Sequence, residues 1–211
     1  MRVGREPVVR AGLKLLDEVG LEGLTLRAIA AELGVRAPTL YWRFKNKQDL
    51  IDEMATQVLA DWAAEYGTQA QAGSWQEWTL AYGRSLRELL LRYRDGARMV
   101  AGSYLTDSRL YESMERILET FRSAGITPTD AAICLSTIYS YTIGYTIEQQ
   151  AVLTPKGERH PRYALAVRDA RIDAERYPLA RSIGADLFDD YDARFDRGLQ
   201  MVIAGFGVSA F

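Results

Sequence analysis

Apolar residues recur along this chain three or four positions apart, the spacing that builds one face of an α-helix. Strand signals are weak, because few stretches alternate β-branched and polar residues and no Asn-Gly or Asp-Gly hairpin joins two such stretches. We therefore predict an all-α fold. The expected helices cover residues 6–19, 26–33, 37–44, 47–67, 75–93, 97–104, 108–124, 129–153, 163–175 and 186–206.

Polar residues that favour helix N-caps precede several of these segments. Thr25, Asn46 and Ser74 each stand directly before a helical stretch, and Thr129 or Asp130 takes that place in the longest one. The polar stretch 67–73 is the best candidate for a boundary within the body of the chain. The first helix is expected to bury one apolar stripe and to exit at a glycine: Val9, Leu13, Leu16, Val19 and Gly20.

Composition excludes several classes of protein. The chain has 211 residues, of which 48% are hydrophobic and 26% charged, and its formal net charge of -2 is typical of a globular rather than a disordered chain. A single cysteine, Cys134, and a single histidine, His160, exclude a disulfide framework and a His-rich metal cage. We expect no metal site and no cofactor. No secretory signal and no bilayer-spanning stretch is evident, so we expect a cytoplasmic protein without a membrane partner.

Charge is distributed unevenly along the chain. Residues 1–48 hold nine basic and five acidic residues, whereas residues 49–211 hold 17 basic and 23 acidic residues. A cationic N-terminal segment on an anionic body indicates contact with a polyanion. The alternative is a basic surface that is merely solvated.

Residues 25–44, with the sequence TLRAIAAELGVRAPTLYWRF, are the most informative segment. Two short helices joined by a tight turn at Gly34 describe a helix-turn-helix. Ala28, Ile29, Leu33 and Leu40 are expected to pack the pair onto the first helix. The second helix would then expose a face of cations, hydroxyls and aromatic rings that suits the major groove of DNA: Arg36, Ala37, Thr39, Tyr41, Trp42 and Arg43.

The alternative is that Tyr41 and Trp42 are core aromatics. The two are adjacent, so they cannot both point inward from one short helix. Four cations also fall within the same 12 residues. These features favour an exposed DNA-binding face.

The run LLDEVGLEGLTLRAIAAELGVRAPTLYWRFKNKQDLIDEMA resembles the N-terminal domain of the TetR family of transcriptional regulators over about residues 5–55. TLYW followed by KNK, SWQEW at 74–78, RDGAR at 94–98 and IGYTIEQQ at 143–150 resemble the tetracycline-repressor branch. The resemblance implies a three-helix helix-turn-helix DNA-binding domain over residues 1–47. It also implies a helical ligand-binding and dimerisation domain over residues 48–211. The expected partners are a palindromic double-stranded DNA operator, a small-molecule effector and a second copy of the chain.

The resemblance also assigns roles in DNA binding. Arg27 matches a guanine-contacting arginine, and Pro38 matches a residue that packs on a thymine methyl. The sequence departs at Ala37, where tetracycline repressors carry glutamine, so we do not expect a tetracycline operator. The resemblance implies phosphate contacts for Thr39, Tyr41 and Lys47. It places Trp42 and Arg43 at the groove-facing end of the recognition helix.

Tetracycline repressors hold a drug–magnesium chelate, and most of the matching positions differ here. Ala63 and Val100 replace two histidines, and the loss of these imidazole ligands argues against magnesium–tetracycline. Glu148 alone keeps its type; we expect it to be buried, where it meets a cationic or hydroxylated ligand or joins a structural hydrogen-bond pair. The other positions that match the chelate site are Tyr82, Ser103 and Ile117 (or Arg116, with a shift of one residue).

These replacements are mostly apolar or aromatic. They predict a pocket for a small, largely apolar or aromatic effector, with few polar groups. The alternative is that the same side chains fill a core and that no effector exists. The pocket is completed by Leu86, Leu105, Leu135 and Tyr139.

The last predicted helix, 186–206, carries an apolar seam. The resemblance favours a dimer in which this helix and the helix 129–153 form a four-helix bundle with their copies. Packing of the seam within its own chain is the alternative. The apolar seam of helix 186–206 comprises Phe188, Tyr191, Phe195, Leu199, Val202 and Phe206. Helix 129–153 carries a line of small residues, which are Thr137, Ser140 and Gly144.

The function expected is that of a ligand-responsive regulator, a repressor released when the effector favours a conformation with its two heads spread apart. The helix 47–66 is the expected lever, through Trp62 and Tyr66. An enzyme is not expected, because the sequence holds none of the common catalytic motifs. The remaining alternative is a DNA-binding regulator or architectural protein without an effector.

Overall fold

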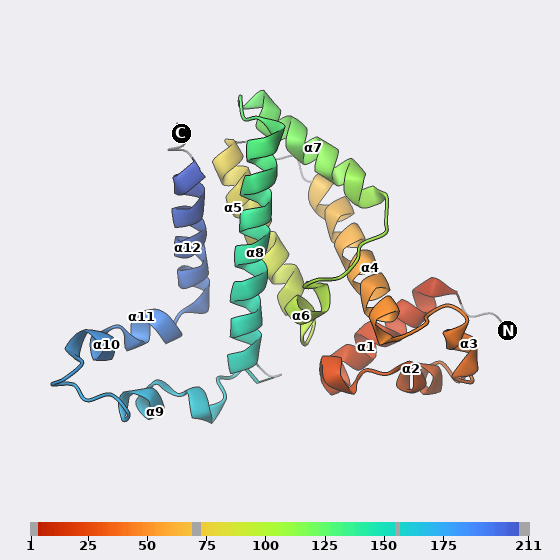
Figure 1. The fold of residues 1–211 in the computed structure, drawn as a ribbon, viewed down its shortest axis with the longest axis horizontal. Coiled ribbons are helices and arrows are strands. Elements are labelled where there is room, and N and C mark those ends of the chain that lie inside the picture. Colours follow the sequence, from red (N-terminus) through yellow and green to blue (C-terminus); the bar gives the residue numbers. More distant parts are fainter. Residues whose placement is uncertain (1–3, 69–72, 155–156, 207–211) are drawn as a thin grey trace.

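Helices make up most of the part of the chain that the structure, a computed structural model, describes: residues 4–68, 73–154 and 157–206 (Figure 1). Within these residues there is no strand, only an isolated bridge between Leu153 and Arg159, so the all-α prediction is confirmed. The helices are α1 (Arg5–Gly23), α2 (Leu26–Glu32), α3 (Pro38–Tyr41), α4 (Lys47–Thr68), α5 (Trp75–Leu91), α6 (Gly96–Val100), α7 (Arg109–Ser123), α8 (Pro128–Val152), the 3-10 turn η1 (Pro161–Tyr163), α9 (Leu165–Asp169), α10 (Pro178–Ser182), α11 (Gly184–Phe188) and α12 (Tyr191–Phe206).

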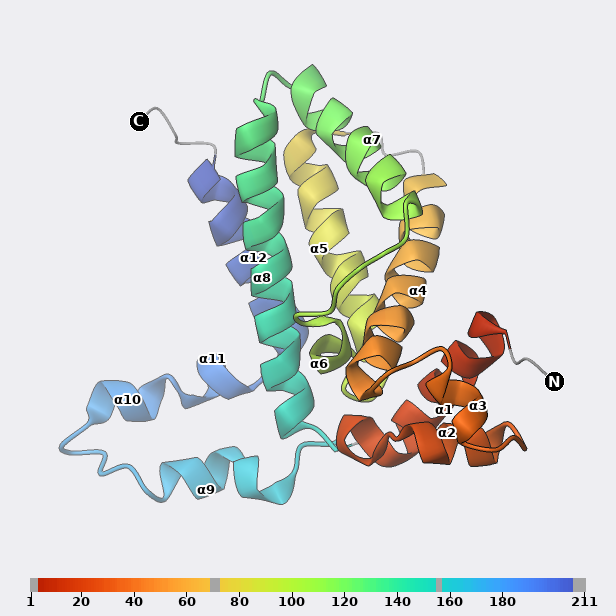
Figure 2. The ribbon, with the colours of Figure 1, turned by 45° about the vertical axis from the view of Figure 1, so that its right-hand side comes forward.

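The helices α1, α2 and α3 form a head at one end of the molecule, and α4 runs from the head into the body (Figures 1 and 2). In the body, α5 packs against α8 and α12, and α7 lies across α4 and α8. None of the described helices is long and apolar enough to cross a membrane.

Side-chain caps fix several helix starts where the sequence predicts them. The Thr25 hydroxyl accepts the Ala28 N–H at 3.1 Å, and the Asn46 side chain accepts the Asp49 N–H at 2.9 Å. Ser74 forms a reciprocal capping box with Glu77. Each of these bonds satisfies a backbone N–H that the first helical turn leaves without a partner.

The cap of α8 differs from the prediction. Thr127, rather than Thr129 or Asp130, holds the N-cap position and accepts the Asp130 N–H at 3.2 Å. Pro128 follows as the first helical residue, where its missing N–H costs nothing.

The first helix also runs further than predicted. It continues to Gly23, interrupted at Gly20, which has a φ of +72°. This left-handed residue turns the end of the helix, and Val19 is consequently exposed rather than part of the buried stripe.

The predictions for residues 163–175 and 186–206 were wrong in their bounds. The first segment forms only η1 and α9, and the second is two helices, α11 and α12. Asp190 separates these two helices: it has a φ of +46°, and its carboxylate accepts the Ala193 N–H at 3.0 Å in the first turn of α12. An aspartate that reads as a helical residue therefore acts as a helix break and a cap.

The apolar seam of α12 packs within its own chain. Phe195 and Leu199 are fully buried in a core cluster shared with α5 and α8. Gly83 of α5 permits this approach, because a Cβ placed on it would lie 2.7 Å from a Leu199 methyl group. Of the two interpretations of the seam, intrachain packing therefore holds for these two residues, and the prediction that they contact a second copy is wrong.

The buried hydrophobic side chains form two core clusters. One joins the head to α6 and the end of α5, and the other lies among α5, α7, α8 and α12. Trp62 of α4 and Tyr82 of α5 pack against both clusters. The segment from η1 to α11 projects away from the body between the ends of α8 and α12 (Figures 1 and 2).

Gly96 begins α6 at a point where no larger residue fits. A Cβ there would lie 2.2 Å from the Leu90 carbonyl oxygen, a backbone atom that cannot move aside cheaply. We expect Gly96→Ala to lower the free energy of unfolding by about 1–3 kcal/mol, measured by chemical denaturation. Gly205→Ala, at a helical position with no atom within 4 Å, is the control and should leave stability unchanged or slightly raised. Equal effects of the two substitutions would contradict the steric argument.

Candidate nucleic-acid interface and effector site

The helix-turn-helix forms because a few apolar side chains fasten two short helices to the head. Ile29 of α2 is fully buried, and Leu40 and Phe44 are almost so. Gly34 makes the turn with a φ of +64°, and the Val35 N–H closes it by donating to the Ala30 carbonyl at 2.9 Å. The short helix α3 is thereby held in place by one buried leucine while its other residues face outward.

The outward face of α3 matches the sequence prediction. Trp42 is 92% exposed and Tyr41 is 48% exposed, so the interpretation of these rings as core aromatics is wrong. Arg36, Pro38 and Arg43 are also exposed, as is Arg27 on α2, and Ala37 and Thr39 are half-buried.

The cations of this face are available to a ligand. Among the residues that the structure describes, the guanidinium groups of Arg27, Arg36 and Arg43 make no hydrogen bond and no ion pair. Together with the exposed rings, they form a cationic, aromatic surface of the kind that binds a phosphate backbone and base edges.

Lys47 differs from these cations. Its ammonium group donates to the Leu21 carbonyl at 2.6 Å and to the Glu22 carbonyl at 3.3 Å, and it is only half-exposed. It therefore joins the start of α4 to the end of α1, a contact that the sequence did not indicate.

The predicted effector residues come mostly from the facing sides of α4, α5, α6 and α8. Ala63, Leu86, Val100 and Leu135 are buried, and Tyr82 is partly buried beside them. The half-buried members of the predicted set are Ser103 and Leu105 in the segment between α6 and α7, Ile117 on α7 and Tyr139 on α8.

Glu148 does not belong to this set in the structure. It is exposed on α8, one helical turn after the exposed Gly144, so the expectation that it is buried was wrong. The helical period explains the outcome, because the turn that carries Gly144 outward carries Glu148 outward too.

Four aromatic rings pack together at one end of the predicted effector residues. Trp78 and Tyr82 stack with ring centroids 5.4 Å apart, and Trp62 and Tyr66 stack at 5.5 Å. Trp62 lies 5.5 Å from Tyr82 and donates its indole N–H to Ser85 at 2.8 Å. Sequence reasoning singled out Trp62, Tyr66 and Tyr82 but missed Trp78, which the four-residue spacing from Tyr82 would have indicated.

Burial changes the titration of the groups near these rings. It raises the pKa of Tyr82 far above its ordinary value, with smaller contributions from the neighbouring Tyr139 and Tyr66, and it raises the pKa of Tyr139. Burial also raises the pKa of the Cys134 thiol to about 11, so this thiol is protonated and unreactive at neutral pH. Within the described ranges, no three His, Cys, Asp or Glu residues lie close enough to hold a metal ion.

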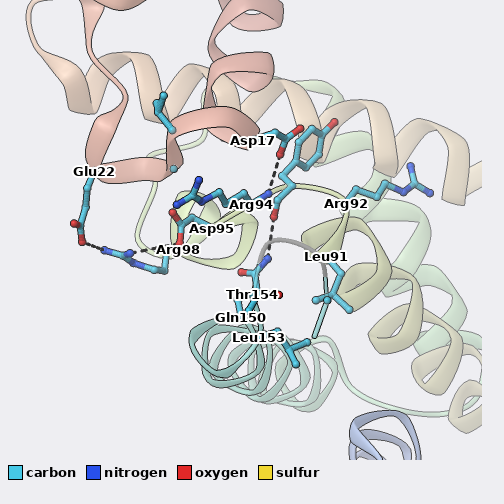
Figure 3. A pocket seen from close by; sticks show the side chains of 14 residues that line it. Asp17, Glu22, Leu91, Arg92, Arg94, Asp95, Arg98, Gln150, Leu153 and Thr154 are labelled. Atoms are coloured by element: carbon cyan, nitrogen blue, oxygen red, sulfur yellow. Dashed lines mark hydrogen bonds and ion pairs between the residues drawn. The ribbon is translucent and has the colours of Figure 1, made fainter. Parts of the chain in front are cut away.

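A cleft of about 570 Å³ lies where the head meets the body (Figure 3). It is lined by the end of α1, the turn between α5 and α6, and the end of α8. Across it, the Arg94 backbone N–H donates to the Asp17 carboxylate at 2.8 Å, and the Leu21 N–H donates to the Asp95 carboxylate at 2.8 Å. These two bonds tie the head to the turn.

The same turn is tied to α8. The Gln150 side chain donates to the Leu90 carbonyl at 3.1 Å and to the Tyr93 carbonyl at 2.9 Å, and it accepts the Ala97 N–H at 3.2 Å. Gln150 lies beside the turn in Figure 3. The head, the turn and the end of α8 thus form one hydrogen-bonded unit.

Known proteins share this architecture. Residues 8–54 match the family model described as bacterial regulatory proteins, tetR family, and residues 68–209 match the model described as tetracyclin repressor-like, C-terminal domain. The class D tetracycline repressor protein of Escherichia coli is 36% identical over 98% of this chain and 90% of its own length.

Among solved structures, a possible TetR family transcriptional regulator from Streptomyces coelicolor A3(2) is 35% identical, with a TM-score of 0.83 over 97% of this chain and 98% of its own. A TetR variant from Acinetobacter baumannii AYE in complex with minocycline is 30% identical, with a TM-score of 0.72 over 97% of each chain. BioQ bound to its double-stranded DNA operator is 25% identical, with a TM-score of 0.67 over 98% of this chain and 99% of its own. The chain belongs to the TetR family of transcriptional regulators, which are not enzymes.

Proposed function

We propose that this protein is a homodimeric repressor whose head, residues 1–47, reads a palindromic operator. In this proposal the body, residues 48–211, binds a small, largely apolar or aromatic effector that releases the DNA and is not magnesium–tetracycline. The observation that carries the proposal is the exposed face of α3, where Trp42 stands in solvent beside cations that no acid neutralises among the described residues.

An exposed tryptophan on a DNA-free head has a cost, because a large apolar surface meets water there. Such a surface usually marks an interaction site. The neighbouring guanidinium groups of Arg36 and Arg43 make a nucleic acid its natural partner. BioQ, a relative with the same architecture, has been solved with its operator. The half-buried Ala37 offers no group that hydrogen-bonds a base, so its contribution to sequence reading is steric.

Lys47 completes the proposed phosphate contacts. It is the first residue of α4, and backbone N–H groups at a helix start attract a phosphate. Its ammonium group now rests on the Leu21 and Glu22 carbonyls. In the proposed complex it shares its remaining hydrogen-bonding capacity with the DNA backbone.

The proposed dimer face lies on the outer sides of α8 and α12. Met201 of α12 is 69% exposed and Ile133 of α8 is 51% exposed, although both are apolar. Thr137, Ser140 and Gly144 form the exposed small-residue line of α8 and permit close approach of a second helix. A dimer is also what a palindrome requires, because its two half-sites need two heads.

The effector is proposed to bind among the residues that replace the histidines of tetracycline repressors. Ala63 and Val100 are buried and supply no metal ligand. The related protein from Acinetobacter baumannii has been solved with minocycline, which supports a ligand-binding body of this type. The aromatic side chains of Trp62 and Tyr82 indicate a ligand with a flat, apolar part.

Coupling between effector and operator is proposed to pass through two connections. The helix α4 carries Lys47 at the head and Trp62 in the body. The turn between α5 and α6 joins Gln150 of α8 to α1 through Asp95. An effector that prefers one arrangement of these connections shifts the population of head positions by its difference in affinity for the two states.

Substitution of Trp42 tests the DNA-binding face. Because its side chain is 92% exposed, Trp42→Ala should change the free energy of unfolding by less than about 0.5 kcal/mol. Operator binding should weaken by roughly 1–3 kcal/mol, measured by fluorescence anisotropy with a duplex selected from a random-sequence library on the unmodified protein. Met114→Ala, an exposed apolar residue on α7, is the matched control for surface hydrophobicity. Unchanged affinity of the Trp42 variant would count against the proposed face.

Substitution of Gly144 tests the dimer face. A Cβ at this position meets no atom within 4 Å, so a single chain accommodates Gly144→Arg without a clash. In the dimer, the added charge would be buried without a partner, and we expect the dimer dissociation constant to rise at least about 100-fold. Sedimentation should then show the mass of one chain, 23.7 kDa, and operator affinity should fall. Thr120→Arg, on the exposed side of α7, is the control and should leave the dimer and its operator affinity unaltered. If the Gly144→Arg variant remains a dimer, this interface is refuted.

Substitution of Asp95 tests the second connection. Asp95→Ala removes the acceptor of the Leu21 N–H, and we expect a loss of roughly 1–3 kcal/mol of stability with faster hydrogen exchange at the end of α1. Glu22→Ala, which removes only an exposed ion pair to Arg98 at 3.5 Å, should cost less than about 1 kcal/mol. If exchange at Leu21 stays slow in the Asp95 variant, the head is held to the body by other contacts.

A further inference from the structure

We propose that the effector is a flat, uncharged ring compound with at least two hydrogen-bond-accepting oxygen atoms, held by the hydroxyl groups of Tyr82 and Tyr139. This inference rests on the proposed function and specifies the chemistry of its effector. It also modifies the sequence-based expectation of a pocket with few polar groups.

The two tyrosines come from neighbouring helices of the body. Tyr82 lies on α5 and Tyr139 on α8, two helices that pack against each other, and both side chains pack against the same core cluster. Tyr82 packs against both core clusters, and Tyr139 packs against the cluster that joins the body to the head. The pair therefore lies at the seam between the clusters, where both side chains keep part of their surface accessible.

Neither hydroxyl has a partner within the described part of the chain. Two other tyrosines of α8 differ in this respect. Tyr141 donates to the Phe195 carbonyl at 3.0 Å, and Tyr145 donates to the Tyr191 carbonyl at 2.8 Å. A tyrosine hydroxyl inside a protein usually has a hydrogen-bond partner, so two open hydroxyls at one place indicate a ligand that supplies one.

Two threonines add further open hydroxyl groups. Thr142 is fully buried, and its Oγ1 has no partner; it follows Tyr139 by three residues and so lies on the same side of α8. Thr56 is also buried with an unpartnered Oγ1, two helical turns before Ala63 on the same side of α4. These four unpartnered hydroxyls come from three helices that line the proposed effector site.

The surroundings of the two tyrosines favour an uncharged ligand. Burial raises the pKa of both tyrosines, so both stay protonated and donate their hydrogens at neutral pH. The predicted site holds one acid, Glu148, and within one chain it points to the outer side of α8, away from the two tyrosines. A charge on a ligand held by the two tyrosines would therefore have no opposite charge from the predicted site of the same chain beside it.

The aromatic rings of the protein at this seam indicate the shape of the ligand. Trp62 and Tyr82 lie 5.5 Å apart at this seam, and aromatic faces pack favourably on another flat ring. Two tyrosine donors require two acceptors, which carbonyl oxygens on opposite sides of a ring system provide.

The experiment uses the full-length protein and three probes of matched shape. They are 9,10-anthraquinone, with two carbonyl groups; anthracene, with none; and anthraquinone-2-carboxylate, with a negative charge. Binding is followed by quenching of tryptophan fluorescence. We expect the unmodified protein to bind anthraquinone at least tenfold more tightly than either of the other two probes.

Two variants test whether the difference in affinity between the probes comes from the two tyrosine hydroxyl groups. Tyr82→Phe and Tyr139→Phe should each weaken anthraquinone binding roughly tenfold and leave anthracene binding within about twofold. Tyr141→Phe is the matched control, because it removes a hydroxyl from the same helix that is already bonded to the Phe195 carbonyl. It should leave the relative affinities of all three probes unchanged.

Three results would overturn the inference: equal binding of the quinone and the hydrocarbon, tighter binding of the carboxylate, or no effect of the two phenylalanine variants. Failure of anthraquinone to bind at all would overturn it too. Each protein is also titrated with the selected operator duplex. Intact operator binding with a failed probe test refutes the effector chemistry alone, whereas the absence of any selected duplex refutes the proposed function.

Discussion

The turn between α5 and α6 is the constraint on which the rest of the structure depends. Gly96 lets the chain pass against the Leu90 carbonyl where no side chain would fit, and this close passage brings Asp95 to the end of α1. Gln150 of α8 holds the same turn from the other side. Because the head touches the body here and along α4, a change in the packing of α5 or α8 reaches the DNA-binding face through a hydrogen-bonded turn rather than through a loose linker.

The body combines two properties that a ligand-responsive regulator needs. Its apolar stripes are mostly satisfied within one chain, as the burial of Phe195 and Leu199 shows, so each chain folds around its own core. At the seam between the two clusters, however, Tyr82 and Tyr139 keep hydroxyl groups without partners. The buried hydroxyl groups of Thr56 and Thr142 have no partner either, and a ligand that bonds to a buried, unpaired hydroxyl recovers the cost of leaving it open. The same seam is crossed by Trp62 of α4, so a ligand there contacts the helix that leads to the head.

Much of the head could be predicted from the sequence because its determinants are local. The cap at Thr25, the turn at Gly34 and the single buried Leu40 lie within sixteen residues, and the helical period then fixes which neighbours face outward. Adjacent Tyr41 and Trp42 could not both be buried on so short a helix, and neither is. The second role of Lys47 was not predictable, since it depends on carbonyl groups more than 20 residues away.

By itself the sequence determined the helical class, most helix starts and the exposed cationic face of α3, because caps and periodicity act over a few residues. Only the tertiary structure decided what the apolar stripes pack against. A stripe records that a helix face is buried but not which surface covers it, so the partner of Leu199 was open until α5 came within reach through Gly83. The break at Asp190, the outward position of Glu148 and the open hydroxyl of Tyr82 likewise depend on contacts and orientations that no local pattern specifies.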